Sequence, residues 1–273
     1  MSLRFQSLLL NSLLATIAVV VAAPLAWMLS ASFMPAGAAQ TSPPTLLPEA
    51  FTLNHYRDLF SRLHVSRYLI NSLVIATSVT FLALILNSLA GYAFAKLQFR
   101  GRERLFQVLL AALVIPAQVA MLPLFMLLKQ LGLINSYWAV ILPASATIYG
   151  IFLVRQFATS IPDSLLDAAR IDGAGELRIF FSMVLPWLRP VLLTLGLFTF
   201  LAMWNDFMWP LIVLSDKQNY TLPVALAILS GEHVQDSELM MAGAVLTTLP
   251  VLLIFLLLQK YFIGGIMLGS VKG

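Results

Sequence analysis

Acidic and amide side chains within apolar segments are the residues of this chain best suited to chemistry. Asp206 follows Asn205 in a strongly apolar stretch, and a carboxylate inside a membrane span is costly and usually functional. About fifteen residues from Val191, at 1.5 Å per residue, place Asp206 roughly 22 Å across the membrane, near the outer leaflet. Two interpretations stay open: Asn205 and Asp206 lie beside a wet substrate pathway, or Asp206 extends to the membrane interface.

Asn71 and Asn87 are a second pair of candidates, within the apolar stretch 68–97. Asn87 belongs to a stripe of small and polar residues spaced three and four apart, which forms one helix face. The stripe consists of Ala76, Thr80, Ala83, Asn87 and Ala90. Small residues let helices pack closely in lipid, so the stripe predicts helix packing or, alternatively, a pathway lined by Asn71 and Asn87.

Patterns typical of catalysis and of metal or cofactor binding are missing from the sequence. The three histidines, His55, His64 and His233, have no metal-ligand spacing, and there is no cysteine. No phosphate-binding Gly-x-x-x-x-Gly-Lys-Ser/Thr loop occurs, so ATP and Mg²⁺ are not expected to bind this chain. The sequence therefore predicts no catalytic residue, no metal site, no cofactor and no enzyme activity.

The composition is that of an integral membrane protein. Hydrophobic residues make up 60% of the chain and charged residues 10%, and the mean hydropathy is +0.91. We expect one all-α transmembrane domain over residues 1–273, since a span takes about 20 apolar residues. Six spans are predicted, at about 8–33, 68–97, 105–128, 137–158, 191–214 and 240–262. A cleavable signal is the rival for the first, but its apolar run exceeds the 7 to 15 residues or so of a signal.

Basic residues predict the orientation of these spans. With both termini cytoplasmic, eleven basic residues lie on the cytoplasmic side: Arg4, Lys96, Arg100, Arg102, Arg104, Arg155, Arg170, Arg178, Arg189, Lys260 and Lys272. Five lie outside: Arg57, Arg62, Arg67, Lys129 and Lys217. This asymmetry follows the positive-inside rule and places the loop 159–190 in the cytoplasm. The formal net charge of only +4, divided between two sides, argues against nucleic-acid binding.

The loop 159–190 is the longest segment with a water-facing helical pattern. Pro162 and the acidic and hydroxyl residues after it are helix-start signals, and Gly173 is a stop signal. We expect a helix over 164–172, a sharp turn at Gly173 and a second short helix over about 174–183. A plain capped connector and a docking surface both fit this shape.

The residues of this loop resemble the coupling loop of bacterial ABC importer permeases. The matching residues are Asp167, Ala168, Ala169, Asp172, Gly173 and Ala174, with Pro186 and Pro190 downstream. That loop typically reads Glu-Ala-Ala-x-x-x-Gly, so Asp167 keeps the charge with a shorter side chain. Segments outside this loop look like permeases of maltose-type carbohydrate importers, in their shorter six-span form: Gly91–Ala95, Leu131–Ser136, Trp204–Pro210 and Gly269–Gly273.

The resemblance implies an assembly in the bacterial cytoplasmic (inner) membrane. Its expected partners are a second permease, two ATP-binding subunits that hold ATP and Mg²⁺, and an extracytoplasmic sugar-binding protein, besides the lipid bilayer. The loop 159–190 would dock on an ATP-binding subunit, and ATP hydrolysis there would drive alternating access and inward movement of a sugar or oligosaccharide. By the same likeness, the loop 215–239 would touch the binding protein.

Other functions stay open at the level of sequence. Within the ABC class the substrate could instead be a polyol, a glycerol phosphate or an oligopeptide. Outside it, an ion-coupled secondary transporter would use Asp206 as its ion or proton site, although inverted repeats are not evident. A membrane scaffold without a pathway would be a third case, in which Asn87→Ala changes stability and not flux.

Overall fold

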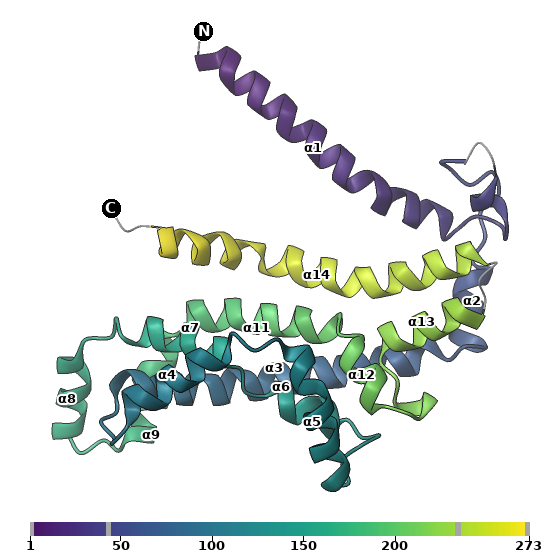
Figure 1. The fold of residues 1–273 in the computed structure, drawn as a ribbon. Helices are drawn as coiled ribbons and strands as arrows, with labels where there is room; N and C mark the ends of the chain where they lie inside the picture. Colours follow the sequence, from purple (N-terminus) through teal and green to yellow (C-terminus); the bar gives the residue numbers. More distant parts are fainter. Residues whose placement is uncertain (1–2, 42–44, 233–235, 271–273) are drawn as a thin grey trace. The chain divides into compact units, whose positions relative to one another are not determined.

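The computed structural model describes residues 3–41, 45–232 and 236–270, and within them the chain is helical without a β-strand (Figure 1). The predicted all-α class is therefore confirmed. His233, Lys272 and the end of the motif 269–273 lie outside the described residues. The chain divides into two compact units, residues 1–66 with 225–253, and residues 67–224 with 254–273.

Unit 1 contains α1 (Leu3–Ala31), α2 (Asn54–Ser61), most of α13 (Leu222–Glu232) and much of α14 (Ser237–Ser270). Polar contacts fasten the segment after α1 to its neighbours. The backbone N–H of Ala39 donates to Glu238 at 2.7 Å, and the His55 ring lies 2.8 Å from the carbonyl of Met34. Buried His55 thus has a structural partner, as expected for a histidine without metal-ligand spacing. Glu238 is bonded through Oε1, whereas its buried Oε2 has no hydrogen-bond partner among the described residues.

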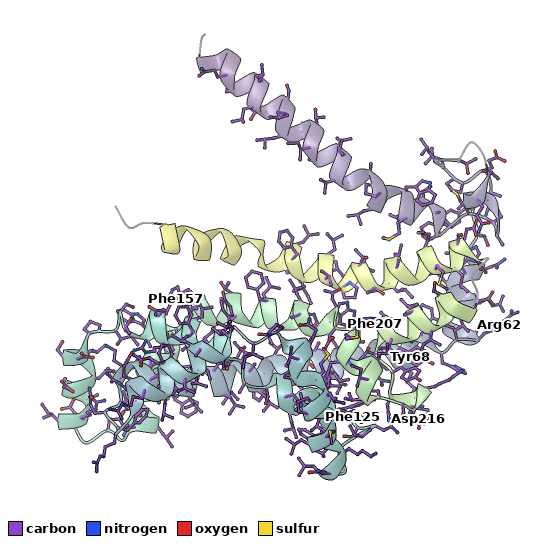
Figure 2. All side chains as sticks on the ribbon, viewed as in Figure 1. Arg62, Tyr68, Phe125, Phe157, Phe207 and Asp216 are labelled. Atoms are coloured by element: carbon purple, nitrogen blue, oxygen red, sulfur yellow. The ribbon has the colours of Figure 1, made fainter. Side chains whose placement is uncertain are left out.

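Unit 2 is built along α3 (Val65–Lys96), which is 32 residues long. Around it lie α4 (Arg102–Ala112), α5 (Ala117–Gln130), α6 (Trp138–Ala144), α7 (Ile148–Ala158), α11 (Arg189–Trp204) and α12 (Met208–Val213). In Figure 1, α8 (Asp163–Ile171) and α9 (Glu176–Ile179) lie at one end of α3, and α12 lies toward the other. Figure 2 likewise places Phe157 and Asp216 at opposite ends of this unit.

The described residues contain up to six stretches that are long and apolar enough to cross a membrane, judged by length and composition. Four stretches qualify on their own: Leu9–Ala31, Val65–Lys96, Trp138–Ala158 and Ser237–Leu257. Two more qualify as bent pairs, α4 with α5 at 105°, and residues 176–187 with α11 at 80°. The predicted span 105–128 is therefore two helices, with Pro116 immediately before α5, where its fixed φ and missing N–H suit a helix start.

Two apolar clusters fill unit 2. One joins α3, α7, α8, α9 and α11 through buried side chains such as Tyr92, Val154, Leu166, Ile179 and Leu195. The other joins α3, α6 and α12 through side chains such as Ile75, Ala139 and Val213. Because α3 contributes to both clusters, it is the element that connects the two ends of the unit.

Candidate functional site

The α8 helix and the turn after it form as the sequence predicts. Extended backbone at Pro162 precedes the helix, which begins at Asp163. Gly173 has φ +81°, a conformation that favours glycine, and its N–H donates to the carbonyl of Arg170 at 3.0 Å. The N–H of Ala174 donates to Ala169 at the same distance. These two bonds satisfy carbonyls that a helix end leaves open, and they direct the chain into α9.

A charged network joins α8, α9 and α3. Arg170 donates to Asp167 and to Glu176, each at 2.7 Å. The hydroxyl of Tyr92 on α3 donates to the other Glu176 oxygen, also at 2.7 Å. The hydrogen bond from Arg170 holds the pKa of Glu176 below its usual value, and the same bond raises the pKa of Arg170. Asp167, which the family resemblance assigns to coupling, therefore has an intramolecular partner.

Lys96, in the last turn of α3, forms a second attachment. Its ammonium donates to the carbonyl of Ile161 at 2.6 Å and to the carboxylate of Asp163 at 2.7 Å. The Lys96 side chain is only 7% exposed, whereas that of Asp163 is 76% exposed. The hydrogen bond from Lys96 holds the pKa of Asp163 below its usual value. The largely buried ammonium of Lys96 thus fixes the start of α8 to α3.

The underside of α8 and α9 is apolar. Leu166 of α8 and Ile179 of α9 are almost fully buried, in one cluster with Tyr92. Leu166 lies among exposed neighbours on α8, so this helix presents one apolar side to unit 2. Hydrophobic contact and the polar network therefore act together to make α8, α9 and the end of α3 one packed unit.

The six predicted coupling residues divide between two environments. Asp167, Ala168, Asp172 and Gly173 are exposed, whereas Ala169 and Ala174 are half-buried against the apolar cluster. Ile171, which the sequence did not single out, is 86% exposed beside them. Tyr92, Lys96 and Glu176 were also missed, since their role depends on contacts 67 to 84 residues away in the chain. The i,i+3 spacing of Asp167 and Arg170 was the one local signal.

Asn71 and Asn87, the two candidates on α3, are both buried and hydrogen-bonded. Asn71 donates to the carbonyls of Gln218 and Tyr220 and accepts from Tyr137 at 2.6 Å. Asn87 accepts from the backbone N–H of Thr147 at 3.0 Å, in the break between α6 and α7. Both amides hold irregular backbone in place, which supports the packing interpretation of these positions.

Asn205 and Asp206 lie where α11 ends and α12 has not begun. Asn205 is exposed and donates to Leu201 within its own helix, at 2.8 Å. Asp206 is half-buried and lines a pocket of about 310 Å³, with Met121 of α5 and Pro143 of α6 among the walls. Of the described residues that line this pocket, only Asp206 is charged. Asp206 therefore lines a pocket, and Asn205 lies next to Asp206 in the chain.

The loop after α12 is held to the start of α3 and to the turn before α6. Arg67 donates to the carbonyl of Gln218 at 3.0 Å, and Asn135 accepts from the N–H groups of Ser215 and Asp216. Asn135 has φ +62°, which asparagine tolerates better than most residues. This polar platform lies at the opposite end of α3 from α8 and α9 (Figures 1 and 2).

Comparison with known proteins identifies the family. Residues 87–267 match the family described as "Binding-protein-dependent transport system inner membrane component". The chain is 38% identical to the arabinooligosaccharides transport system permease protein AraQ of Halalkalibacterium halodurans, over 95% of this chain and 94% of that protein. It is also 38% identical to the lactose transport system permease protein LacG of Rhizobium radiobacter, over 78% of each.

A solved structure has the same fold. A chain of a bacterial ABC transporter involved in the import of the acidic polysaccharide alginate superposes with a TM-score of 0.83 at 24% identity, over 95% of this chain and 97% of that one. The resemblance found in the sequence is thus confirmed. The chain belongs to the family of binding-protein-dependent transport system inner membrane components, and it is an ABC importer permease.

Proposed function

We propose that this chain is a permease subunit of a carbohydrate ABC importer, with α8 and the turn at Gly173 as its docking element for an ATP-binding subunit. The relatives named for arabinooligosaccharides and lactose support a sugar or oligosaccharide as the substrate. A further structural neighbour, at a TM-score of 0.67, is from an alginate transporter in complex with a substrate-bound periplasmic protein. That complex supports an extracytoplasmic binding protein as a partner.

The attachment of α8 and α9 to α3 is the observation that carries the coupling proposal. Lys96 holds Asp163, Tyr92 holds Glu176, and Leu166 is buried beneath. Displacement of α8 by a closing ATPase would therefore displace the end of α3 instead of bending a free loop. We place ATP and Mg²⁺ on two partner ATP-binding subunits and the second half of the pathway on another permease, with alternating access as the result.

The proposed docking surface is small, exposed and partly apolar. Ala168 and Gly173 allow close approach, Ile171 offers an exposed apolar side chain, and Asp172 is an exposed carboxylate. Because Asp167 is already bonded to Arg170, its part in docking is to hold Arg170 and Glu176 in position. The cytoplasmic placement of this surface, and of both termini, rests on the distribution of basic residues.

A co-purification experiment tests this proposal. The chain is expressed with its neighbouring genes and purified in mild detergent as wild type, Ala168→Trp and Gly173→Pro. Ala168→Trp adds bulk to the docking surface without touching the Tyr92 or Lys96 contacts, and proline cannot adopt the positive φ of Gly173. Gln156→Trp, at an exposed position of α7, is the size-matched control.

We expect a P-loop ATPase to accompany wild type and Gln156→Trp and to be lost from the other two variants. Retention of the ATPase by Ala168→Trp would contradict the docking surface. If wild type brings no ATPase, the ATP-driven mechanism itself is wrong, and ion-coupled transport through Asp206 becomes the function to test. If the ATPase accompanies wild type, uptake assays with labelled disaccharides, oligosaccharides and polyols identify the substrate class.

A further inference from the structure

A groove of about 450 Å³ runs along α11 in unit 2. One face of α11 forms its floor, Thr80 and Leu84 of α3 form a wall, and Ile254 of α14 completes it. The lining residues of α11 recur every three or four positions: Arg189, Leu192, Leu193, Gly196, Leu197 and Phe200. The groove therefore follows one helix face for most of the length of α11.

The groove has one cation and otherwise mostly apolar walls. Among the described residues, Arg189 is the only charged one that lines the groove. Its side chain is exposed, and within the part of the chain that the structure describes it has no ion pair. Trp187 is 50% exposed two residues before it, and tryptophan is typical of membrane interfaces. Arg189 thus carries a positive charge without an ionic partner among the described residues, at one end of the apolar groove.

The dimensions of the groove match one membrane leaflet. From Arg189 to Phe200 the helix rises about 16 Å, at about 1.5 Å per residue. The hydrocarbon core is about 30 Å thick, so one leaflet takes about half of it. Arg189 belongs to the cytoplasmic set of basic residues, which places the charged end at the inner interface.

The helix that precedes α11 borders the groove at its charged end. Residues 176–187 and α11 meet at an angle of 80°, and Leu185 of the preceding segment lines the groove together with Arg189. Pro190 fits the first turn, where no intrahelical N–H bond is lost, and the positive end of the helix dipole adds to the charge of Arg189. Gly196 lets α11 lie close to α3 beneath the groove, since a Cβ there would lie 3.2 Å from Leu84 Cδ1.

We propose that this groove binds one anionic phospholipid of the cytoplasmic leaflet. Its phosphate group pairs with Arg189, and an acyl chain lies along Leu193, Gly196 and Phe200. Basic pockets between membrane helices on the cytoplasmic side are suited to anionic head groups. A purely apolar helix of another permease would cover the walls but would leave the guanidinium without an anion, which is costly in the membrane. This proposal does not depend on the coupling role of α8.

Native mass spectrometry of the assembled importer in mild detergent tests the proposal, with added phosphatidylglycerol and, separately, phosphatidylcholine. Arg189→Gln removes the charge, and Leu193→Trp fills the groove at a residue that is 41% exposed. Arg104→Gln is the charge-matched control, because Arg104 is exposed on α4 outside the groove. Phe198→Trp is the control for bulk, at a position of α11 that is 47% exposed and does not line the groove.

We expect wild type and both controls to retain phosphatidylglycerol in preference to phosphatidylcholine. Arg189→Gln should lower retention about fivefold, the factor that one basic side chain near an anionic surface contributes, and Leu193→Trp should lower it at least as much. Equal binding of phosphatidylcholine, an equal loss in Arg104→Gln, or full retention in Leu193→Trp would each overturn the proposal.

A thiol reporter separates a lipid from a partner helix. The chain has no cysteine, so Leu193→Cys supplies a single thiol. The thiol is labelled with a lipid-soluble maleimide. The proposal is supported if added phosphatidylglycerol slows this labelling. Crosslinking of this thiol to a second permease, with no phospholipid retained by the complex, would show that a helix occupies the groove and would overturn it.

Discussion

The hydroxyl of Tyr92 donates to the carboxylate of Glu176 across 84 residues of sequence, at 2.7 Å. Four residues further along α3, Lys96 donates to Asp163. At the other end of the same helix, Asn71 and Arg67 bond to Gln218. One continuous helix thus holds the proposed docking element at one end and the polar loop after α12 at the other. A rigid α3 is therefore the simplest physical connection by which a movement at one end of the helix could reach the other end.

Tyr92→Phe should weaken coupling without unfolding the chain. The substitution removes the bond to Glu176 and keeps the ring, whose centroid lies 5.7 Å from that of Phe180. A hydrogen bond to a charged group contributes about 1.5–3 kcal/mol, so the loop should loosen measurably. We expect more ATP hydrolysed per sugar transported, measured in proteoliposomes. Tyr149→Phe, at an exposed position of α7, is the control and should leave the ratio unchanged.

Gly173→Ala should destabilise the turn between α8 and α9 by about 1–2 kcal/mol. The cost is the left-handed backbone, since Gly173 has φ +81° and no atom lies near its missing Cβ. Gly175 has equally open space but φ −70°, so Gly175→Ala is the matched control and should be neutral or slightly stabilising. Amide hydrogen exchange of residues 164–180 measures both. Equal effects of the two substitutions would contradict the conformational explanation.

Gly150→Ala should destabilise the break between α6 and α7. A Cβ at Gly150 would clash with Asn87 Nδ2 and lie 2.7 Å from Thr147 Oγ1, so the buried amide must move. Asn87→Ala leaves the N–H of Thr147 without its acceptor, at a cost of about 1–3 kcal/mol. Gly231→Ala is the control, because open space surrounds its missing Cβ. Melting temperature in detergent should fall for the first two variants only.

Acid should release α8 and α9 from α3. The pKa of Asp163 and that of Glu176 both lie below their usual values, because of hydrogen bonds from Lys96 and Arg170 respectively. A lowered carboxyl pKa contributes stability that is complete above the unfolded pKa, about 4, and is lost as pH falls through the folded value. Hydrogen exchange of residues 163–180, corrected for intrinsic rates, should therefore be constant near neutrality and rise only below about pH 4. Glu176→Gln should make the exchange rate depend less on pH. An unchanged pH profile in this variant would contradict the role of Glu176.

Asp206→Asn should reduce sugar uptake while leaving ATPase binding intact. Asp206 is the charged group of a pocket shared by α5, α6 and α12, at a distance in sequence from the docking element. A carboxylate that accepts hydrogen bonds from a sugar is worth more than a neutral amide, so a several-fold loss of uptake is expected. Asn205→Ala is the control, since the Asn205 amide bonds within its own helix. Unchanged uptake in Asp206→Asn would remove Asp206 from the pathway.

Local signals account for the elements that the sequence predicted well. A proline, an acidic first turn and a glycine stop bound α8 within one residue of the expectation, because capping depends on nearest neighbours. The apolar stretch at 105–128 was harder, since hydropathy registers total burial in lipid and is insensitive to a 105° bend. The coupling residues could be named from their resemblance to a family motif, and their docking role stays a prediction.

Composition by itself determined that this is a helical membrane protein, because the cost of placing charge and open backbone in lipid depends on residue type. The water-facing position of the loop 159–190 stays a prediction from the asymmetry of basic residues. Only the tertiary structure decided that Asn71 and Asn87 hold backbone in place, and that Tyr92 and Lys96 hold α8 and α9. The physical reason is that these contacts join residues far apart in the chain, and their geometry depends on how helices pack.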